Sequence, residues 1–459
     1  MKLRPVFIAC GILAIAPGHS QTSTPNAPRA LALPEVISLA LTQNLALQRS
    51  SVQIELRENV VESEKADFRP NLTGSAGATL RMSGDGRDPI WKTEEINESA
   101  NGSLNSSLTL YRGDEQKASL EEAKASLEAS VADFDRSQQQ ILFQAVSRYL
   151  EADLRLKEID IQTEELATRR ENLVRIEVDY ENEIRIFADV QRQRALVADS
   201  ERRLELAKRA YESSLFLLKD LLLLPPNMEI VLDLRDANWL NPENIEEPSV
   251  TESLGRIRER PDFLAQEFRL RAADQSIRIA RSGRRPTVTA NARLSSSYSG
   301  NNPFGSFGRQ FFENQPDISG GVSVSVPFFD RRRTETNVVR ARLQKQQEEI
   351  GLRSLEQAAE TDLRLAVLNF NSSRFQLTAS REQLSSAELA LEAEQARYEA
   401  GAATLLDVNS LRSDRLDAAV SVEESRFDLF INRLEVSFQD GTIESFLLDQ
   451  LKTNIPELE

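Results

Sequence analysis

Two spacings of apolar residues recur along the chain and predict two kinds of element. In long stretches an apolar residue returns at every seventh position between charged residues, which is typical of coiled-coil helices. Two such series coincide when the chain is shifted by 218 residues. Their members are Ala145, Ala152, Ile159, Leu166, Leu173 and Tyr180, and Leu363, Phe370, Leu377, Leu384, Leu391 and Tyr398. Helices of about seventy residues, on the order of 100 Å long, are therefore expected.

Shorter segments alternate apolar residues with serine, threonine and asparagine, which predicts strands. They lie at about 70–82, 102–111, 286–298 and 317–328. Strands of roughly ten residues are long enough to cross a bilayer, with the apolar face toward lipid and the hydroxyl-rich face toward water. A sheet half-buried in a water-soluble protein fits the alternation equally well, because the signal of each strand is weak.

The elements occur twice in the same order, which indicates a tandem repeat. FRPNLTGSAGATL at 68–80 matches RRPTVTANARL at 284–294. Each unit is expected to begin with one helix, about 34–66 and 250–283. The predicted domains are a signal peptide at 1–20, a first repeat at 21–224 with its helical hairpin at about 112–224, an inter-repeat equatorial segment at 225–258, a second repeat at 259–440 with its hairpin at about 330–438, and a C-terminal tail at 441–459.

The long helices are interrupted at two matching places, VDYENEIRIFADV at 178–190 and ARYEAGAATLLDV at 396–408. Gly401 permits a backbone conformation that ends a helix, so the chain is expected to reverse there. In the first copy Glu183 stands at that position, and we expect Asn182 to take the left-handed conformation instead. The residues expected to form the two turns are Asn182, Glu183, Ala400, Gly401, Ala402 and Ala403.

Composition narrows the range of functions. The first twenty residues, MKLRPVFIACGILAIAPGHS, have the basic start, apolar run and small-residue end of a secretory leader. Its removal takes away Cys10 and His19, the single cysteine and histidine. Disulfides, cysteine–histidine metal sites and serine–histidine triads are then excluded, and no cofactor or metal is expected. A net charge of −16 argues against nucleic acid as a partner.

Closure of the sheet argues for an assembly. Four strands do not close into a barrel, and an open sheet in lipid would leave unpaired backbone groups along two edges. Several copies of the chain would therefore have to complete one barrel together. Three copies would supply twelve strands, an even number within the known range, and their long helices would continue the barrel as a tube.

Three further motifs add to the evidence from the leader and the repeat. They are ERPDF at 259–263, PFFD at 327–330 and RYEAGAATLLDV at 397–408. Together they resemble the TolC-like outer-membrane factors, the outer membrane efflux protein family, over about 34–440. The resemblance implies a mostly α-helical fold with a small membrane β-barrel. It implies a homotrimer whose twelve-stranded barrel contacts outer-membrane lipid and is continued by an α-helical barrel in the periplasm.

The resemblance also implies a function. Such a trimer is a passive outer-membrane channel-tunnel, the exit duct of a tripartite efflux or type I secretion system. It docks a periplasmic adaptor (membrane fusion) protein and an inner-membrane pump or ABC exporter at its hairpin tips. A periplasmic coiled-coil scaffold without a pore is the alternative. An enzyme with paired carboxylates survives the composition filter, but no segment between the repeats indicates a cleft, so the chain is expected not to be an enzyme.

The family pattern implies a periplasmic gate formed by Asp189 and Tyr398, where a phenol donates a charge-assisted hydrogen bond to a carboxylate. Some relatives carry an arginine at the position of Ala403, so part of this latch is missing here. Asp407 would form an acidic ring in the lumen that favours cations. Each residue also has a structural interpretation: Tyr398 ends an apolar seam, and Asp407 suits the positive end of a helix dipole.

Two other surfaces are expected from the sequence. The tips at about 181–188 and 399–406 would dock the adaptor. The loops at about 83–98 and 299–316 would face outside, and the second contains four phenylalanines, which indicate either a plug or an interfacial anchor. Ordinary local packing in a solvated loop is an equal alternative. The four are Phe304, Phe307, Phe311 and Phe312.

Overall fold

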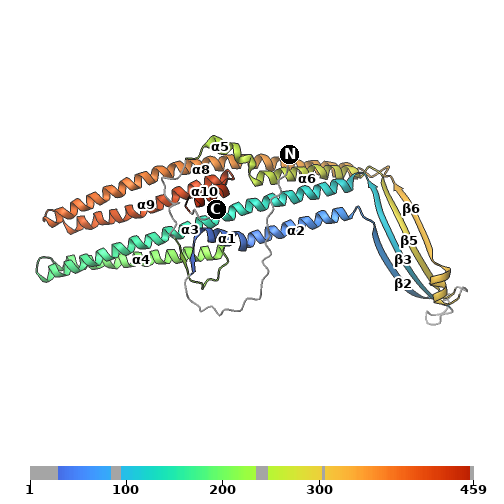
Figure 1. Ribbon diagram of the computed structural model, residues 1–459, viewed down its shortest axis with the longest axis horizontal. Coiled ribbons are helices and arrows are strands. Elements are labelled where there is room, and N and C mark those ends of the chain that lie inside the picture. The colour runs from blue at the N-terminus through green and yellow to red at the C-terminus, as the bar shows by residue number, and fades with distance from the viewer. Residues whose placement is uncertain (1–28, 84–94, 234–246, 302–304, 455–459) are drawn as a thin grey trace.

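The computed structural model describes residues 29–83, 95–233, 247–301 and 305–454. Long helices run side by side and join a curved sheet at one end (Figure 1). The first-repeat elements are β1 (Arg29–Leu31), α1 (Leu33–Gln43), α2 (Leu45–Ala66), β2 (Asn71–Ser83), β3 (Glu95–Arg112), α3 (Glu115–Glu181), α4 (Phe187–Leu221) and β4 (Ile230–Leu232). The later elements are α5 (Val250–Arg256), η3 (Ile257–Glu259), α6 (Pro261–Ser282), β5 (Thr287–Ser299), α7 (Phe307–Arg309), η4 (Gln310–Asn314), β6 (Asp317–Ser325), α8 (Arg333–Glu399), α9 (Leu405–Gln439) and α10 (Ile443–Asn454).

Four pairs of corresponding elements in the two repeats have equal lengths. The long helices α3 and α8 each contain 67 residues, and the returning helices α4 and α9 each contain 35. Helices α2 and α6 both span 22 residues, and strands β2 and β5 both span 13. The mostly helical, two-repeat fold expected from the sequence is therefore confirmed.

The prediction of one continuous opening helix in each repeat, at 34–66 and 250–283, was wrong, because the helix is interrupted in both repeats. Asn44 is extended, and its side-chain oxygen accepts a hydrogen bond of 2.8 Å from the Ala46 amide, which starts α2 as a new helix. In the second repeat Arg260 is extended and Pro261 starts α6. Asparagine caps the new helix with its side chain, whereas proline favours the first turn of a helix. The two repeats therefore share the break but have no common residue at it that would predict it.

The apolar seam of α8 is buried in the middle of the helix and becomes accessible toward the tip. Leu363 and Phe370 are 0 % and 1 % exposed, whereas Leu391 and Tyr398 are half-buried. α8 packs against α9, and α3 packs against α4, as two antiparallel hairpins (Figure 1). Helices this long depend on such packing because isolated helices are only marginally stable in water.

The four long strands form one antiparallel sheet in the order β2-β3-β5-β6. In the described sheet, β2 and β6 are each paired on one side only. β3 begins at Glu95 and not near 102, because its polar first residues lack the alternation that marked the rest. β6 ends at Ser325 and not near 328; Pro327, which has no amide proton to donate, lies just beyond.

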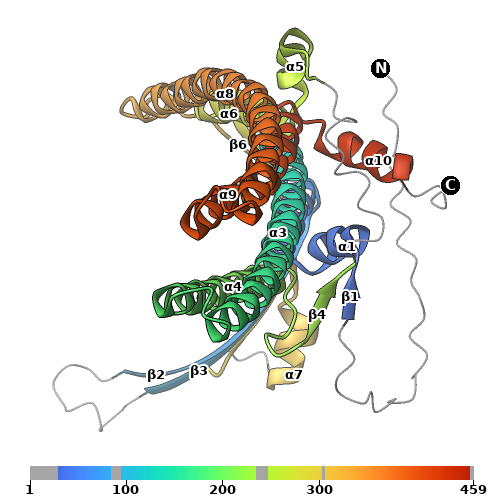
Figure 2. The same cartoon turned by 90° about the vertical axis from the view of Figure 1, so that its left-hand side faces the viewer.

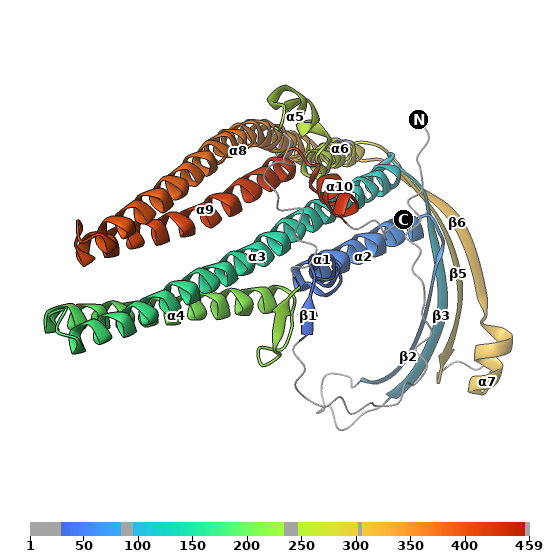
Figure 3. The same cartoon turned by 60° about the vertical axis from the view of Figure 1, so that its left-hand side comes forward.

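A separate group of small elements lies on the convex side of the arc of helices, as Figures 2 and 3 show. β1 pairs in parallel with β4, and α1 and α10 share a core with the middle of α3, including Leu31, Val146 and Leu434. α10 makes most of the expected C-terminal tail at 441–459 helical. The expected leader at 1–20 lies outside the described residues. None of the helices in the described ranges is long and apolar enough to cross a membrane.

Candidate functional site

Both hairpin turns close by the same pattern of backbone hydrogen bonds. At the first tip the Glu183 amide donates to the Tyr180 backbone carbonyl, and the Ile184 amide donates to the Asp179 backbone carbonyl. At the second tip the Gly401 amide donates to the Tyr398 backbone carbonyl, and the Ala402 amide donates to the Arg397 backbone carbonyl. These paired bonds form the Schellman motif, which needs a left-handed residue just after the helix.

The left-handed residue of the first turn is Glu183, with φ of 60°, and the expectation that Asn182 takes this conformation was wrong. Asn182 has φ of −85°, and its side-chain amide donates to the Val178 carbonyl at 2.9 Å. The Schellman bonds fix which position is left-handed, whatever residue occupies it. Gly401 fills the equivalent position with φ of 77°.

Tyr398 is held by Arg185, a residue that the sequence did not single out. The Arg185 guanidinium donates a hydrogen bond to the Tyr398 hydroxyl, and its carbon lies 4.9 Å from the centre of the ring. This contact joins the turn of the first hairpin to the end of α8 in the second. The equivalent residue of the first repeat, Tyr180, has a different neighbour: the centre of its ring lies 6.0 Å from that of Phe187.

Asp189 lies half-buried in the first turn of α4. Within one chain the structure engages Tyr398 through Arg185 and not through Asp189. A latch between Asp189 and Tyr398 of neighbouring chains stays a prediction.

Asp407 lies in the first turn of α9 and forms a reciprocal cap with Thr404. The Asp407 amide donates to the Thr404 hydroxyl at 3.3 Å, and the Asp407 carboxylate accepts from the Thr404 amide at 3.0 Å and from its hydroxyl. Hydrogen bonds from the Thr404 hydroxyl and amide lower the pKa of Asp407 below its ordinary value of 3.8. The carboxylate is exposed, so the cap leaves it accessible to solvent ions.

The first tip carries exposed apolar side chains that sequence reasoning missed. Ile184, Ile186 and Phe187 are 68 %, 67 % and 58 % exposed. At the second tip Ala400, Gly401 and Ala402 are exposed but small, and Ala403 is half-buried. The run EIRIFADV contained the signal, because turns between soluble helices rarely hold three large apolar residues.

A buried charged cluster joins the two hairpins above the tips. The Arg169 guanidinium donates to Glu165 at 2.5 Å and to Asn409 of α9 at 3.0 Å, and all three residues are buried. Arg412 is also buried there, and burial, together with the positive charge of Arg169, lowers its pKa. The ion pair lies within α3, and the hydrogen bond from Arg169 to Asn409 is the contact that reaches α9. Because a buried ion pair is costly to break, it holds Arg169 in position to link the two hairpins.

The sheet exposes one continuous apolar face. Leu72 of β2 and Ile318 of β6 are 72 % and 82 % exposed, and Leu104 and Leu294 lie opposite each other in the middle. Apolar patches of this extent normally mark contact with protein or membrane.

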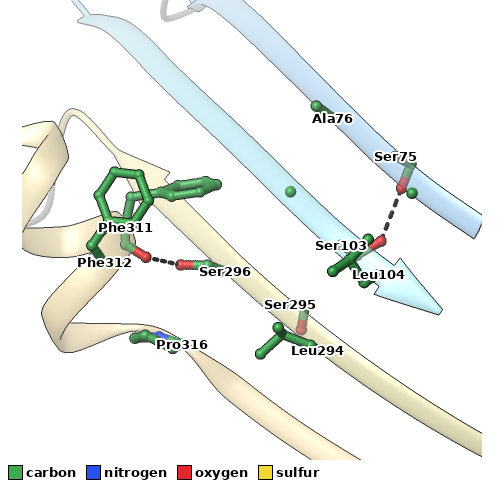
Figure 4. A pocket seen from close by; sticks show the side chains of 12 residues that line it. Ser75, Ala76, Ser103, Leu104, Leu294, Ser295, Ser296, Phe311, Phe312 and Pro316 are labelled. Atoms are coloured by element: carbon green, nitrogen blue, oxygen red, sulfur yellow. Dashed lines mark hydrogen bonds between the residues drawn. The ribbon is translucent and has the colours of Figure 1, made fainter.

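The phenylalanine-rich loop folds back onto this apolar face (Figure 4). Phe311 lies so close to Gly102 that a Cβ there would come within 2.8 Å of the ring. Ser296 donates a hydrogen bond to the Phe311 carbonyl, and Phe312 meets Phe311 edge-on at 5.3 Å. Phe311 thus packs on the sheet, and a role of the loop as plug or interfacial anchor stays a prediction. Phe304 lies outside the described residues.

These features together define a class of outer-membrane protein in which a sheet with an exposed apolar face continues into long paired helical hairpins. The outer membrane efflux protein family model matches residues 36–222 and 256–428, so the chain belongs to this family. Membership confirms the resemblance stated above and places the chain in the outer membrane.

Individual relatives agree with this assignment. Outer membrane protein TolC of Escherichia coli (strain K12) is 27 % identical over 212 residues, 44 % of this chain and 43 % of that protein. This chain thus matches less than half of that relative's length. The Campylobacter jejuni CmeC outer membrane channel superposes with a TM-score of 0.75 at 17 % identity, covering 96 % of both chains. The open state of the Neisseria gonorrhoeae MtrE outer membrane channel gives 0.75 at 20 %, covering 90 % and 89 %.

Proposed function

We propose that three copies of the chain form a passive outer-membrane channel-tunnel, the exit duct of a tripartite efflux or type I secretion system. The observation that carries this proposal is the open sheet. Its two outer strands, β2 and β6, are each paired on one side only in the described structure, and its apolar face is exposed. In a bilayer each unpaired backbone group would cost several kcal/mol, so the edges of neighbouring chains must pair.

The repeat supplies the geometry of that pairing. Within one chain β3 of the first repeat pairs with β5 of the second, and α3 packs against α6. The equivalent contact of the next pair joins β6 and α8 of one chain to β2 and α2 of a neighbour. Three chains linked in this way give a closed barrel of about twelve strands.

A periplasmic coiled-coil scaffold without a pore is the competing function. It explains the hairpins but leaves the apolar face and the open edges of the sheet in water, where they would favour aggregation. The two functions differ in a direct measurement. The duct predicts stepwise ion conductance when purified protein is added to a planar bilayer, and the scaffold predicts none.

The hairpin tips are the proposed docking surface for a periplasmic adaptor, which would connect the duct to an inner-membrane pump or ABC exporter. The exposed Ile184, Ile186 and Phe187 support this role, because an apolar tip favours burial against a partner. Phe187→Ser should reduce adaptor capture without changing conductance. Unchanged capture in that variant would remove the first tip from the docking surface.

We further propose that Tyr398, with Arg185 and Asp189, controls the periplasmic entrance, and that Asp407 contributes an acidic ring to the lumen. The contact of Arg185 with Tyr398 supports the first role. The exposure of the Asp407 carboxylate supports the second, since a capped aspartate keeps its negative charge facing solvent.

A further inference from the structure

A polar groove lies between the beginning of α3 and the end of α6, directly below the sheet. It has a volume of about 420 Å³. The charged side chains that line it are Asp114, Lys117, Glu121, Arg278, Arg281 and Arg285. Four cations and two acids therefore meet in one place, on a chain whose net charge is −16.

Both acids of the groove are already paired. Asp114 accepts a hydrogen bond from Arg285, and Glu121 accepts one from Lys124 at 2.7 Å. Among the described residues, no acidic side chain forms an ion pair with the other three cations. These three, named here the cationic triad, are Lys117, Arg278 and Arg281. Three like charges lining one groove favour an anion that neutralises them.

The groove lies at the level where the apolar face of the sheet ends. β3 ends at Arg112 and β5 begins at Thr287, and the groove starts at Gly113 and Arg285. The last large apolar side chain of β3 before this point, Leu110, is 53 % exposed. If the sheet lies in the bilayer, the groove is at the depth of the lipid headgroups on the periplasmic side.

The groove also opens outward and not into the duct. Lys117 and Glu121 lie 21 residues, three heptads, before Gln138 and Leu142 on the same helix. Gln138 and Leu142 line a hollow shared with α1 and α10. Figure 2 shows α1 and α10 on the convex side of the arc of helices, so the groove faces the surroundings of the assembly.

The cationic triad is not inherited from the repeat. At the equivalent positions Arg278 is replaced by Glu62, and Lys117 by Glu335. Glu62 pairs with Lys65 at 2.7 Å, and Glu335 pairs with Arg332. At the end of α2 and the start of α8, the equivalent elements, these charges thus neutralise one another. Among the described residues at these equivalent positions, the excess of unpaired cations occurs only in the groove between α3 and α6.

We propose that this groove binds the phosphate of an anionic phospholipid in the periplasmic leaflet of the outer membrane; the proposal rests on the bilayer placement of the sheet in the proposed function. The two guanidinium groups match phosphate oxygens in paired hydrogen bonds, and the Lys117 ammonium adds a third positive charge. A lipid at this position would fix the height of the duct in the membrane.

Native mass spectrometry of the detergent-purified protein tests the proposal, with phosphatidylglycerol and phosphatidylcholine as probes. The wild type should retain phosphatidylglycerol in preference to phosphatidylcholine. Arg281→Gln should weaken retention by about fivefold, and removal of the whole triad (Lys117→Gln, Arg278→Gln, Arg281→Gln) should abolish it. Lys65→Gln, at the repeat-equivalent position of Arg281, is the matched control and should bind as the wild type does.

Three results would overturn the lipid site. They are equal retention of both lipids, equal loss in Lys65→Gln and Arg281→Gln, and displacement of phosphatidylglycerol by millimolar inorganic phosphate, which would make soluble phosphate the ligand. Oligomer mass and bilayer conductance are recorded on the same samples. A conducting trimer that fails to select phosphatidylglycerol refutes this proposal alone, whereas a wild type that neither assembles nor conducts refutes the proposed function.

Discussion

The Arg185 guanidinium donates to the Tyr398 hydroxyl and lies 4.9 Å from the centre of its ring, so two residues that are 213 positions apart in the chain join the tips of the two hairpins. A hydrogen bond and a cation–π contact of this kind are each worth about 1 kcal/mol. That is strong enough to hold an entrance closed and weak enough to be released by a docking partner.

Loss of this contact should widen the periplasmic entrance. Tyr398→Phe removes the hydrogen bond and keeps the ring, and Arg185→Gln removes the cation. We expect both variants to show larger single-channel conductance in planar bilayers. Asp189→Asn is the comparison variant: an increase there alone would assign the latch to the residue predicted from the sequence. Wild-type conductance in all three would place the closed state elsewhere.

The two turns should respond in opposite directions to matched substitutions. Glu183 holds a left-handed conformation that costs roughly 1 kcal/mol for a residue with a side chain, so Glu183→Gly should stabilise the first turn. Gly401→Ala should destabilise the second by a similar amount, because no atom lies within 4 Å of an added Cβ and the backbone conformation alone opposes it. Hydrogen exchange of the Ile184 and Ala402 amides measures both; the same sign of change at both tips would contradict the account.

Burial should make the Arg169–Glu165 pair far more important for stability than its exposed neighbour. Arg169→Ala removes the ion-pair partner of the buried Glu165 and the hydrogen bond to Asn409, and should cost about 3–5 kcal/mol. Arg170→Ala breaks an exposed pair with Glu201 and should cost less than about 1 kcal/mol. Thermal unfolding followed by helical circular dichroism should rank the variants in this order. Equal midpoints would mean that the cluster does not hold the hairpins together.

Asp407 has two proposed roles that substitution separates. Thr404→Ala should loosen the start of α9 and leave the charge, whereas Asp407→Asn removes the charge. We therefore expect the reversal potential to show reduced cation preference in Asp407→Asn and wild-type preference in Thr404→Ala. The pKa of Asp407 is lowered in the folded state, so its capping contribution is complete above pH 3.8 and is lost as the pH falls through the lowered value. If both variants keep the cation preference of the wild type, Asp407 serves only to cap α9.

The sequence predicted what depends on repetition and period. The seven-residue spacing of Leu363 and Phe370 predicted the long helices, because burial along one face of a helix imposes a fixed spacing. The alternation that includes Val322 and Val324 predicted the strands, because successive side chains of a strand point to opposite faces. The start of β3 at Glu95 is mostly polar, so its alternation is too weak to mark a strand. Its extent was therefore predicted too short.

The site was less predictable than the fold. Gly401 indicated a turn because glycine adopts the left-handed conformation readily. The left-handed conformation of Glu183 is imposed by the hydrogen bonds of the turn, so the residue type did not predict it. Arg185 is one arginine among many, and its contact with Tyr398 depends on how two distant hairpins pack. Spacing within one helix does not report such contacts.

Pairing between the sheet edges of identical chains would fix a register that a disulfide can test. Leu104 of β3 lies opposite Leu294 of β5, and the repeat offsets carry this pair to Val322 of β6 and Ala78 of β2 in a neighbouring chain. Within one chain these residues lie on opposite edge strands, three strand spacings or at least about 14 Å apart, and they are also displaced along the strands, so they are too far apart for a disulfide. The expected leader holds the one native cysteine, so introduced cysteines have no competitor in the mature chain.

The most direct measurement is therefore oxidation of Val322→Cys/Ala78→Cys in membranes, followed by non-reducing electrophoresis. Paired sheet edges predict a reducible covalent trimer. Val322→Cys/Gly77→Cys should give far less cross-linked trimer, because the second cysteine points to the opposite face of the sheet. A folded protein that stays monomeric in the membrane and forms no cross-link with either pair would contradict this pairing.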